Sequence, residues 1–419
     1  YSKVFNIFNN KKNKKNYNKL ILKKYVQKIK KNNLIFNFLY KKIFSFIKKN
    51  QKYLFHYHYF SKKNYFFICL RLLYLPFQYD EFNFEIRDFK KNRYFLKSEL
   101  RKGNKTKFNN FFNDLLYGFM PSSYLENYYK IVSYSNKINF NPKIIFTSNA
   151  HLSNDTFKIW SAEKVKNGSK LIASDHGLQF DNNYSFNYGN IYFRYIKWVK
   201  TKNKNFTNLP PNKFLDKNNY FNKDKNKILV LLPVKYKNKR HFLHRNGHDI
   251  DDYNFVKKNL IYCFKKYLDN FYFRIHPSCE NKKELEKMIT KDFGKNKIDK
   301  EEKFSDSIKK YKMIIDTDLE TPFLETFLSN IPVISLVNIE LIQIDKNSKS
   351  LLKFMIKNKI IFSEFISSKK YLREVIENPY DWWESKRLVK LKKKLLKTFS
   401  LNNKNNLNKW TVFFENIKV

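Results

Sequence analysis

The sequence predicts an α/β fold in which parallel sheets are covered by crossover helices and the chain is divided between two domains. Short apolar runs alternate with amphipathic segments of helical length over residues 143–199 and again over residues 227–336. Between these regions, residues 201–226 are polar, contain two adjacent prolines and show no periodicity, which indicates a linker. We therefore expect two domains of Rossmann-like architecture.

The first domain is expected to have two parts. Residues 1–106 carry blocks of lysine and asparagine between short apolar clusters, which predicts a basic and mostly helical part. Residues 107–200 are expected to form the Rossmann-like body of the domain. The elements predicted within it are a strand over 143–148, a helix over 155–168 that ends at Gly168, and strands over 170–174 and 191–199.

The second domain is expected to cover residues 227–367. Its predicted strands are 227–234, 271–277, 312–316 and 332–336, and its predicted helices are 253–270, 282–293, 305–311 and 322–330. Residues 368–419 have a helical pattern throughout, with Trp382, Trp383 and Trp410 as apolar anchors. We expect these helices to pack back across both domains.

The charge is strongly positive, with 84 lysines and arginines against 37 acidic residues and a formal net charge of +47. Glycine (7) and proline (10) are scarce while lysine and asparagine abound, which is typical of AT-rich coding. The lysines are spread along the chain, without the arginine clusters or stacking motifs of nucleic-acid-binding domains. We therefore expect a solvated lysine surface and no nucleic-acid partner, although such a surface would favour contact with an anionic inner membrane.

The three cysteines are far apart and form no CxxC pair, which fits a reducing cytoplasm and predicts neither a disulfide framework nor a zinc site. The most apolar stretch, residues 64–79, is interrupted by Arg71 and Pro76 and is too short to span a bilayer. The expected localisation is cytoplasmic, with peripheral association at the inner membrane. No cofactor is expected.

The carboxyl ends of parallel strands are where open α/β sheets bind ligands, so residues that follow the predicted strands are candidates for a site. Asp175, His176 and Gly177 follow the strand 170–174 directly. A histidine titrates near neutrality and a neighbouring carboxylate can orient it, which makes the pair a candidate general base. Gly177 would allow a close backbone approach to a ligand or a positive φ. The alternative is an ordinary loop with a half-buried histidine.

Two segments of the second domain suit a phosphate group. Arg274 and His276 alternate at the end of a strand, and Pro277 stops that strand. Thr321 is expected to cap a helix that starts with Pro322 and would direct its amides at an anion. Glu325, on the first turn, would reach a ribose or sugar hydroxyl.

Residues 240–252 contain His241, His244 and His248 with three aspartates. The segment has no continuous helical face and does not match the usual metal signatures, so no metal site is expected. A mobile loop in which His244 or Arg245 touches substrate is the preferred interpretation.

The motifs also occur in a familiar order. The segments "MPSSYLENY", "KIIFTSNAHLSNDTFKIWSAEKVKNGSKL", "DHG", "YIKWV", "RIHP", "DTDLETPFLETFLSNIPVISL" and "WW" resemble transferases encoded in bacterial lipopolysaccharide and capsule loci. The resemblance covers about residues 107–415. In that family the strand typically ends Gln-His-Gly-Gly, so His176 and Gly177 match whereas Asp175 and Leu178 depart from the pattern.

The second half is similar, more distantly, to CDP-glycerol glycerophosphotransferases and to bacterial sialyl and Kdo transferases. Their His-Pro pair and Ser/Thr-rich helix start hold the nucleotide's phosphate, which by position carries over to His276 with Pro277 and to Thr321. The resemblance implies a GT-B-like architecture, with two Rossmann-like domains facing across a cleft. The nucleotide donor would bind the C-terminal domain and the acceptor the N-terminal one.

These observations predict a metal-independent glycosyltransferase that moves a sugar from a nucleotide-activated donor to a surface polysaccharide or lipid-linked acceptor. His176, with Asp175, would deprotonate the acceptor, while Arg274, His276 and the helix after Thr321 stabilise the departing phosphate. The His-Pro pair favours a CMP- or CDP-linked donor. Two alternatives remain open: a sugar-nucleotide epimerase of the same fold that uses the acids of residues 316–320, and a non-catalytic basic scaffold that binds membrane or nucleic acid.

Overall fold

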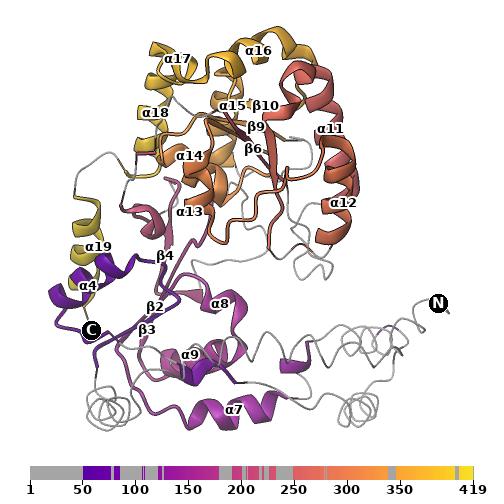
Figure 1. Ribbon diagram of the computed structural model, residues 1–419. Coiled ribbons are helices and arrows are strands. Elements are labelled where there is room, and N and C mark those ends of the chain that lie inside the picture. The colour runs from indigo at the N-terminus through magenta and orange to yellow at the C-terminus, as the bar shows by residue number, and fades with distance from the viewer. Residues whose placement is uncertain are drawn as a thin grey trace, which may run out of the picture. The chain divides into compact units, whose positions relative to one another are not determined.

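Two five-stranded sheets, each entirely parallel, form the framework of the described part of the chain (Figure 1). The computed structural model describes residues 51–76, 80–84, 106, 108, 121–124, 127–178, 191–200, 204, 206–216, 219–220, 226–232, 249–277, 279, 281–337, 346–401 and 405–418. All elements named below lie within residues 52–138 and 142–419, which form one compact unit, and they confirm the predicted α/β class.

The first sheet, sheet A, has the strand order β1-β2-β3-β4-β5. Its strands are β1 (Tyr53–His56), β2 (Ile144–Thr147), β3 (Lys170–Ser174), β4 (Arg194–Lys197) and β5 (Phe206–Asn208). Strands β1 and β2 are buried along their whole length, which is why they have continuous apolar sequences rather than alternating ones.

Two strands of sheet A differ from the prediction. β1 lies in the part of the chain expected to be mostly helical, and β5 lies inside the predicted linker 201–226. β5 is only three half-buried residues long, too short to show a period, and it is recognisable only because it pairs with β4. The polar segment therefore extends sheet A.

The second sheet, sheet B, has the order β10-β9-β8-β6-β7. Its strands are β6 (Ile228–Leu231), β7 (Phe271–Arg274), β8 (Met313–Asp316), β9 (Val333–Leu336) and β10 (Ile361–Phe362). The chain first moves from β6 outward to β7 and then returns to place β8 on the other side of β6. The order thus reverses between β6 and β8, and ligands of open α/β sheets bind at such a reversal.

The helices follow the expected alternation. They are α4 (Lys62–Arg71), α7 (Tyr128–Asn136), α8 (Ala150–Ser153), α9 (Asp155–Lys166), α11 (Asp249–Phe264), α12 (Lys282–Phe293), α13 (Phe304–Ser307), α14 (Thr321–Leu328), α15 (Lys346–Lys357), α16 (Lys369–Glu377), α17 (Pro379–Trp383), α18 (Lys386–Thr398) and α19 (Asn406–Glu415). Short 3-10 turns span Asp80–Phe82, Ser122–Tyr124, Asn212–Phe214 (η3), Lys265–Asn270, Ile308–Lys310 and Ile366–Ser368. Among these described helices, none combines the length and hydropathy needed to cross a bilayer.

The C-terminal helices contribute to two different cores. Leu391 and Leu395 of α18 pack in the cluster that contains residues of β8 and β9. Trp410 and Phe414 of α19 pack instead among side chains of β1 and β2, and the Trp410 indole donates to the carbonyl of Pro210 at 2.9 Å. The C-terminal helices therefore pack against elements of both sheets.

Candidate functional site

The carboxyl edge of sheet A holds a network of buried polar side chains. The hydroxyls of Ser148, after β2, and Ser174, at the end of β3, lie 2.8 Å apart. The Asn212 amide of η3 donates to Ser148 Oγ at 2.9 Å and also to the carbonyl of His58, while it accepts from Trp198 Nε1 at 3.2 Å. The network joins the loops after all five strands of sheet A, so this edge is held in one arrangement.

Asp175 lies directly after β3 and is almost completely buried, with 1% of its surface exposed. Its Oδ2 accepts from the backbone N–H of Trp198 at 2.9 Å, and Lys197 Nζ lies 3.8 Å from Oδ1. Burial raises the pKa of this carboxyl, and the Lys197 charge opposes the rise. The carboxylate is fixed to the end of β4, which suits a residue that positions the loop carrying His176.

Gly177 lies against Thr321, the first residue of α14, which follows β8 of sheet B. A Cβ at Gly177 would lie only 2.4 Å from Thr321 Oγ1, and the next amide, Leu178 N–H, donates to the same oxygen at 3.2 Å. The expected close approach therefore exists, but its partner is a side chain of this protein. The φ of Gly177 is not in the left-handed region, so space rather than conformation requires glycine here.

The start of α14 differs by one residue from the prediction. Glu320 occupies the cap position and Thr321 is the first helical residue, followed by Pro322. The carbonyl of Glu320 accepts from the N–H groups of Phe323 and Leu324 at 3.0 and 3.4 Å. The Thr321 hydroxyl is thereby left to bond the loop after β3 instead of capping its own helix.

One of the acids before α14, Asp316, has a structural role. Asp316 is buried and accepts from Leu319 N–H at 2.8 Å and from Ser335 Oγ at 2.6 Å, so it builds the turn that leads into the helix. Thr317 Oγ1 donates to the carbonyl of Leu231 at 2.5 Å and ties this turn to β6. The turn therefore lies at the point where the strand order of sheet B reverses.

Glu325, expected to contact a ribose or sugar, faces Lys213 of η3 at 3.4 Å. Its side chain is 15% exposed and that of Lys213 is 39% exposed. This ion pair is a second link between α14 and the carboxyl edge of sheet A. Gly177, Thr321 and Glu325 are thus brought into one neighbourhood.

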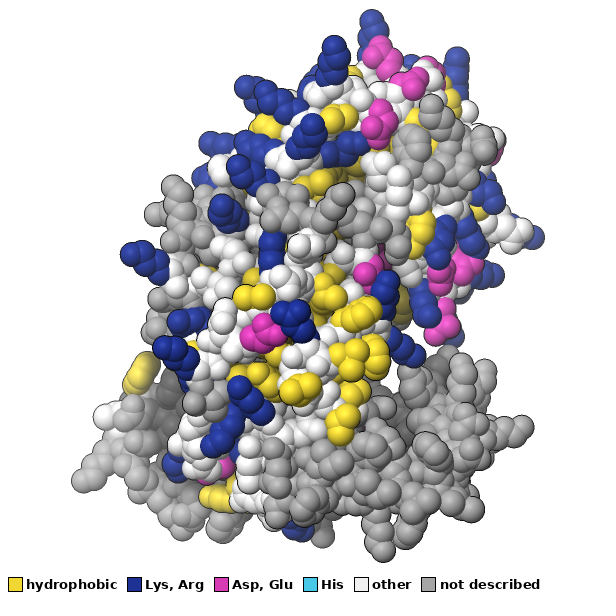
Figure 2. Space-filling model, turned by 90° about the vertical axis from the view of Figure 1, so that its left-hand side faces the viewer, with side chains coloured by type: hydrophobic (Ala, Val, Ile, Leu, Met, Phe, Trp, Pro, Cys, Tyr) yellow, Lys and Arg dark blue, Asp and Glu magenta, His cyan; other side chains and the backbone are white. Residues whose placement is uncertain are grey.

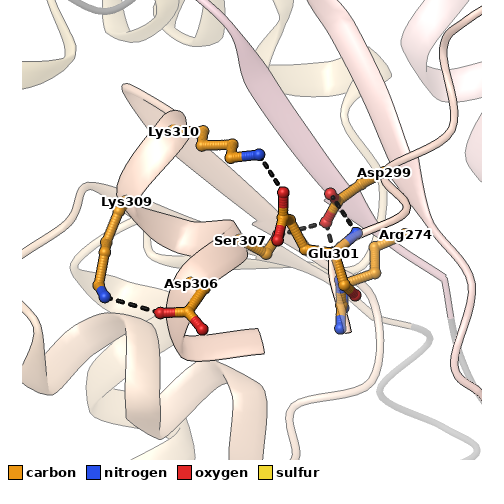
Figure 3. Close-up of polar contacts among 7 residues, drawn as sticks. All are labelled: Arg274, Asp299, Glu301, Asp306, Ser307, Lys309 and Lys310. Atoms are coloured by element: carbon orange, nitrogen blue, oxygen red, sulfur yellow. Dashed lines mark hydrogen bonds and ion pairs between the residues drawn. The ribbon is translucent and has the colours of Figure 1, made fainter. Parts of the chain in front are cut away.

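Arg274, expected to bind a phosphate group, is instead bonded to other groups of the protein. Its guanidinium donates to Asp299 Oδ2 at 2.8 Å (Figure 3). It also donates to the carbonyls of Glu301 and Glu302 at 2.9 and 3.3 Å. Asp299 also accepts from Ser307 Oγ. The arginine is nearly buried and its charge is matched within the protein, so it stabilises the end of β7 rather than presenting a cation to phosphate.

His276 is half-buried after β7, and its carbonyl accepts from Cys279 N–H at 3.0 Å. Burial and, second, the charge of Arg274 lower the pKa of its imidazole. The lowered pKa favours the neutral imidazole, which can form a hydrogen bond as donor or acceptor.

Three further histidines at the carboxyl edge of sheet A were not predicted as site residues from the sequence. Burial lowers the pKa of His56, the last residue of β1, and of His58, in the loop after it, to about 4, and that of His151, in α8, to about 3. The charge of His176 contributes to the shift at His151, so these two rings lie within electrostatic reach of each other. Among the described residues neither nitrogen of His151 has a hydrogen-bond partner. The sequence does contain a signal for these residues, because histidines follow the apolar runs of both β1 and β2.

The histidine-rich segment after β6 cannot be compared with its prediction. His241, His244, Arg245 and His248 lie outside the described residues. Within the ranges that the structure describes, no cluster of three or more histidine, cysteine or acidic side chains could hold a metal ion. Metal independence stays a prediction.

The sequence as a whole matches one family model, which covers residues 1–414 and is described as the LIC12162 family transferase. The chain belongs to the LIC12162 family of transferases. The expectation of a transferase is therefore confirmed, and the alternative of a non-catalytic scaffold is set aside.

Comparisons with individual proteins add little. No curated protein matches the sequence. Among solved structures, the chain is similar to the glycosyltransferase SnogD from Streptomyces nogalater, with 9% identity over 83% of this chain and 89% of that one and a TM-score of 0.32. A likeness this remote carries no argument about activity.

Proposed function

We propose that this transferase is a glycosyltransferase that moves a sugar from a nucleotide-activated donor to an acceptor hydroxyl. The observation that carries the proposal is the contact between the loop after β3 and Thr321 at the start of α14. One partner belongs to the loop that holds His176, and the other lies beside the strand-order reversal of sheet B. A base and a phosphate-binding helix start would thus lie next to each other.

The proposed reaction needs a base on the acceptor side. The acceptor oxygen would attack the anomeric carbon, its proton would pass to the His176 imidazole, and the bond from carbon to the donor's phosphate oxygen would break with its electrons on the phosphate. Asp175, held by Trp198 N–H and Lys197, would keep the loop of His176 in position. The buried network of Ser148, Ser174 and Asn212 supports the same edge.

The departing phosphate needs donors of hydrogen bonds. Because Thr321 Oγ1 accepts from Leu178 N–H, its own hydroxyl hydrogen can be directed to a phosphate oxygen. The positive end of the α14 dipole lies at the same residue and favours the same charge. The neutral imidazole of His276 would form one hydrogen bond with the nucleotide-activated sugar. Glu325 would contact the donor's ribose or sugar after exchanging its bond with Lys213.

The resemblance in sequence extends the proposal to substrates. A GT-B-like arrangement, a CMP- or CDP-linked donor and a surface polysaccharide or lipid-linked acceptor are the classes that fit best. Arg274 is not included among the phosphate ligands, because its guanidinium already has three acceptors.

The test is donor turnover by the purified full chain. CMP-, CDP-, UDP- and GDP-linked sugars are offered in turn, and nucleotide release is measured with and without candidate acceptors. We expect turnover of one donor, loss of transfer of at least 100-fold in His176→Ala, and weakened donor binding in Thr321→Val. Binding of none of the four donors would refute the proposal.

A matched control lies on the same helix. The hydroxyl of Thr326 donates to the carbonyl of Pro322 at 2.8 Å and is buried, so Thr326→Val changes a threonine of α14 without touching the proposed phosphate site. If Thr326→Val weakened donor binding as much as Thr321→Val, the effect would belong to the helix and not to the hydroxyl.

A further inference from the structure

The surface of α4 and of the turn after it presents a concentrated run of apolar side chains. Phe66, Phe67, Leu70, Leu73 and Leu75, here called the α4 face, are 55, 46, 57, 96 and 42% exposed. Among the described residues 17 large hydrophobic side chains are exposed, and five of them fall within these ten positions. Single exposed apolar residues are normal, whereas a contiguous group marks an interaction surface.

The opposite side of α4 packs into the hydrophobic core, so the helix already has its core-facing side and the α4 face is a second, exposed apolar side. Ile68, Cys69 and Tyr74 are buried in the cluster that also contains Phe55 of β1 and Phe414 of α19. The rings of Phe55 and Tyr74 have centroids 5.5 Å apart. The helix is therefore held in one orientation, with its second apolar side turned outward.

The turn after α4 places Leu73 in a left-handed backbone conformation at the end of the α4 face. Tyr74 N–H donates to the carbonyl of Cys69 at 2.9 Å and Leu73 N–H to that of Leu70 at 3.2 Å, which is the Schellman pattern of a helix end. Leu73 has a φ of +49° and is 96% exposed. Glycine or asparagine is expected at this position, because a side chain with Cβ is strained there.

The conformation of Leu73 is shared by residues near other helix ends of this chain. Among the described residues, Leu319, Lys359 and Ser400 also have a positive φ, of +54°, +55° and +57°. Leu319 is buried, whereas Leu73 is 96% exposed. The turn after α4 therefore adds an exposed apolar side chain to the α4 face.

Cationic side chains accompany the α4 face. Lys62 and Lys63 are exposed in the first turn of α4 and precede Phe66 and Phe67 by four residues, so they lie on the same side of the helix. Figure 2 shows the side of the molecule on which α4 lies, with hydrophobic side chains gathered among lysines and arginines. This pairing of apolar and cationic groups is complementary to an anionic lipid surface.

We propose that the α4 face seats the chain on the surface of an anionic phospholipid bilayer. The two phenylalanines and Leu73 enter the headgroup boundary while Lys62 and Lys63 contact lipid phosphates. Ser61 caps α4 directly after the loop that follows β1 at the carboxyl edge of sheet A, so docking brings that edge close to a lipid-linked substrate. Docking itself does not depend on the proposed glycosyl transfer.

The experiment is flotation of the full chain with vesicles of phosphatidylglycerol and phosphatidylcholine, compared with pure phosphatidylcholine. We expect binding to the anionic vesicles and at least tenfold weaker binding for Phe66→Gln and for Leu73→Asn. Leu73→Asn introduces a residue that suits the backbone conformation, so it keeps the fold, as thermal melting will show. Tyr262→Gln on α11, where Tyr262 is 50% exposed, is the control and should bind as the parent does.

Charge reversal separates the two contributions. Lys62→Glu with Lys63→Glu should weaken binding to anionic vesicles and reduce its dependence on salt. The proposal is overturned if the parent chain does not float, or if Phe66→Gln and Leu73→Asn float as well as the parent, which would mean that lysines of the whole surface carry the binding. It is equally overturned if these variants halve the mass in sedimentation, since the α4 face would then bind a second copy.

Discussion

The carboxyl edges of the two sheets are built from different chemistry. At sheet A, two serine hydroxyls and the Asn212 amide form a neutral network, beside histidines whose pKa values are lowered by burial and the loosely matched pair of Asp175 and Lys197, 3.8 Å apart. At sheet B, the Arg274 guanidinium and the Asp299 carboxylate are bonded at 2.8 Å. An edge with few charges suits the proposed general base His176, whereas a closely matched charge pair is fixed and leaves phosphate binding to amides and hydroxyls. The general base is therefore proposed at sheet A and phosphate binding at sheet B, and each edge can be tested separately.

The largest effect is expected from breaking the charge pair of sheet B. Arg274→Met leaves the Asp299 carboxylate, whose side chain is 4% exposed, buried without its cation. Removal of one partner of a buried pair costs about 3–5 kcal/mol of unfolding free energy. The exposed pair of Lys310 with Glu301 is the control, because Lys310→Met should cost under about 1 kcal/mol in the same denaturation experiment. Equal effects would mean that Arg274 is not a structural residue.

Acid should destabilise the folded chain through the buried histidines at the carboxyl edge of sheet A. The pKa of His151 is about 3 in the folded chain and 6.5 ordinarily, so the unfolded chain binds more protons as the pH falls below 6.5. The free energy of unfolding should drop by about 3 kcal/mol from this group between pH 6.5 and 4. His151→Phe removes this contribution and should make that part of the pH profile less steep, while His56 and His58, whose pKa values are also lowered, continue to titrate there. An unchanged profile would show that this histidine is already protonated or exposed.

The contact between the two edges should be sensitive to a single methyl group. Gly177→Ala places a Cβ against Thr321 Oγ1 and should cost about 1–3 kcal/mol of stability. Thr321→Ala removes the oxygen that would clash. The double variant should therefore be more stable than the sum of the two single effects predicts, by about 1 kcal/mol. Additive effects would show that the two residues do not meet.

The smallest effect is expected at the other link between the edges. Lys213 and Glu325 are 3.4 Å apart, and the lysine is partly exposed. Lys213→Ala should change the free energy of unfolding by less than about 1 kcal/mol, since solvent and salt screen such a pair. A change above 2 kcal/mol at 0.15 M salt would assign this pair a structural role that its exposure does not predict.

Much of the fold follows from local patterns. The strands after residue 143 and the helical tail are continuous apolar runs or amphipathic repeats, and such patterns report burial directly. β5 was not predicted, because a three-residue polar strand owes its existence to a neighbour. The candidate site was predicted only in outline. Gly177 was expected to approach a ligand and Thr321 to cap its helix, whereas the structure places these two residues against each other, and the bond between Leu178 and Thr321 was not predicted.

The sequence by itself determined the parallel α/β class, the order of its elements and the chemical types gathered after each strand, because these depend on neighbours in the chain. Only the tertiary structure decided which of those groups meet. Leu178 and Thr321 are 143 residues apart, and Arg274 finds its acid 25 residues further on. Contacts at such separations depend on the order of strands within a sheet, and no local periodicity encodes that order. The reversal between β6 and β8 is therefore a property of the folded chain alone.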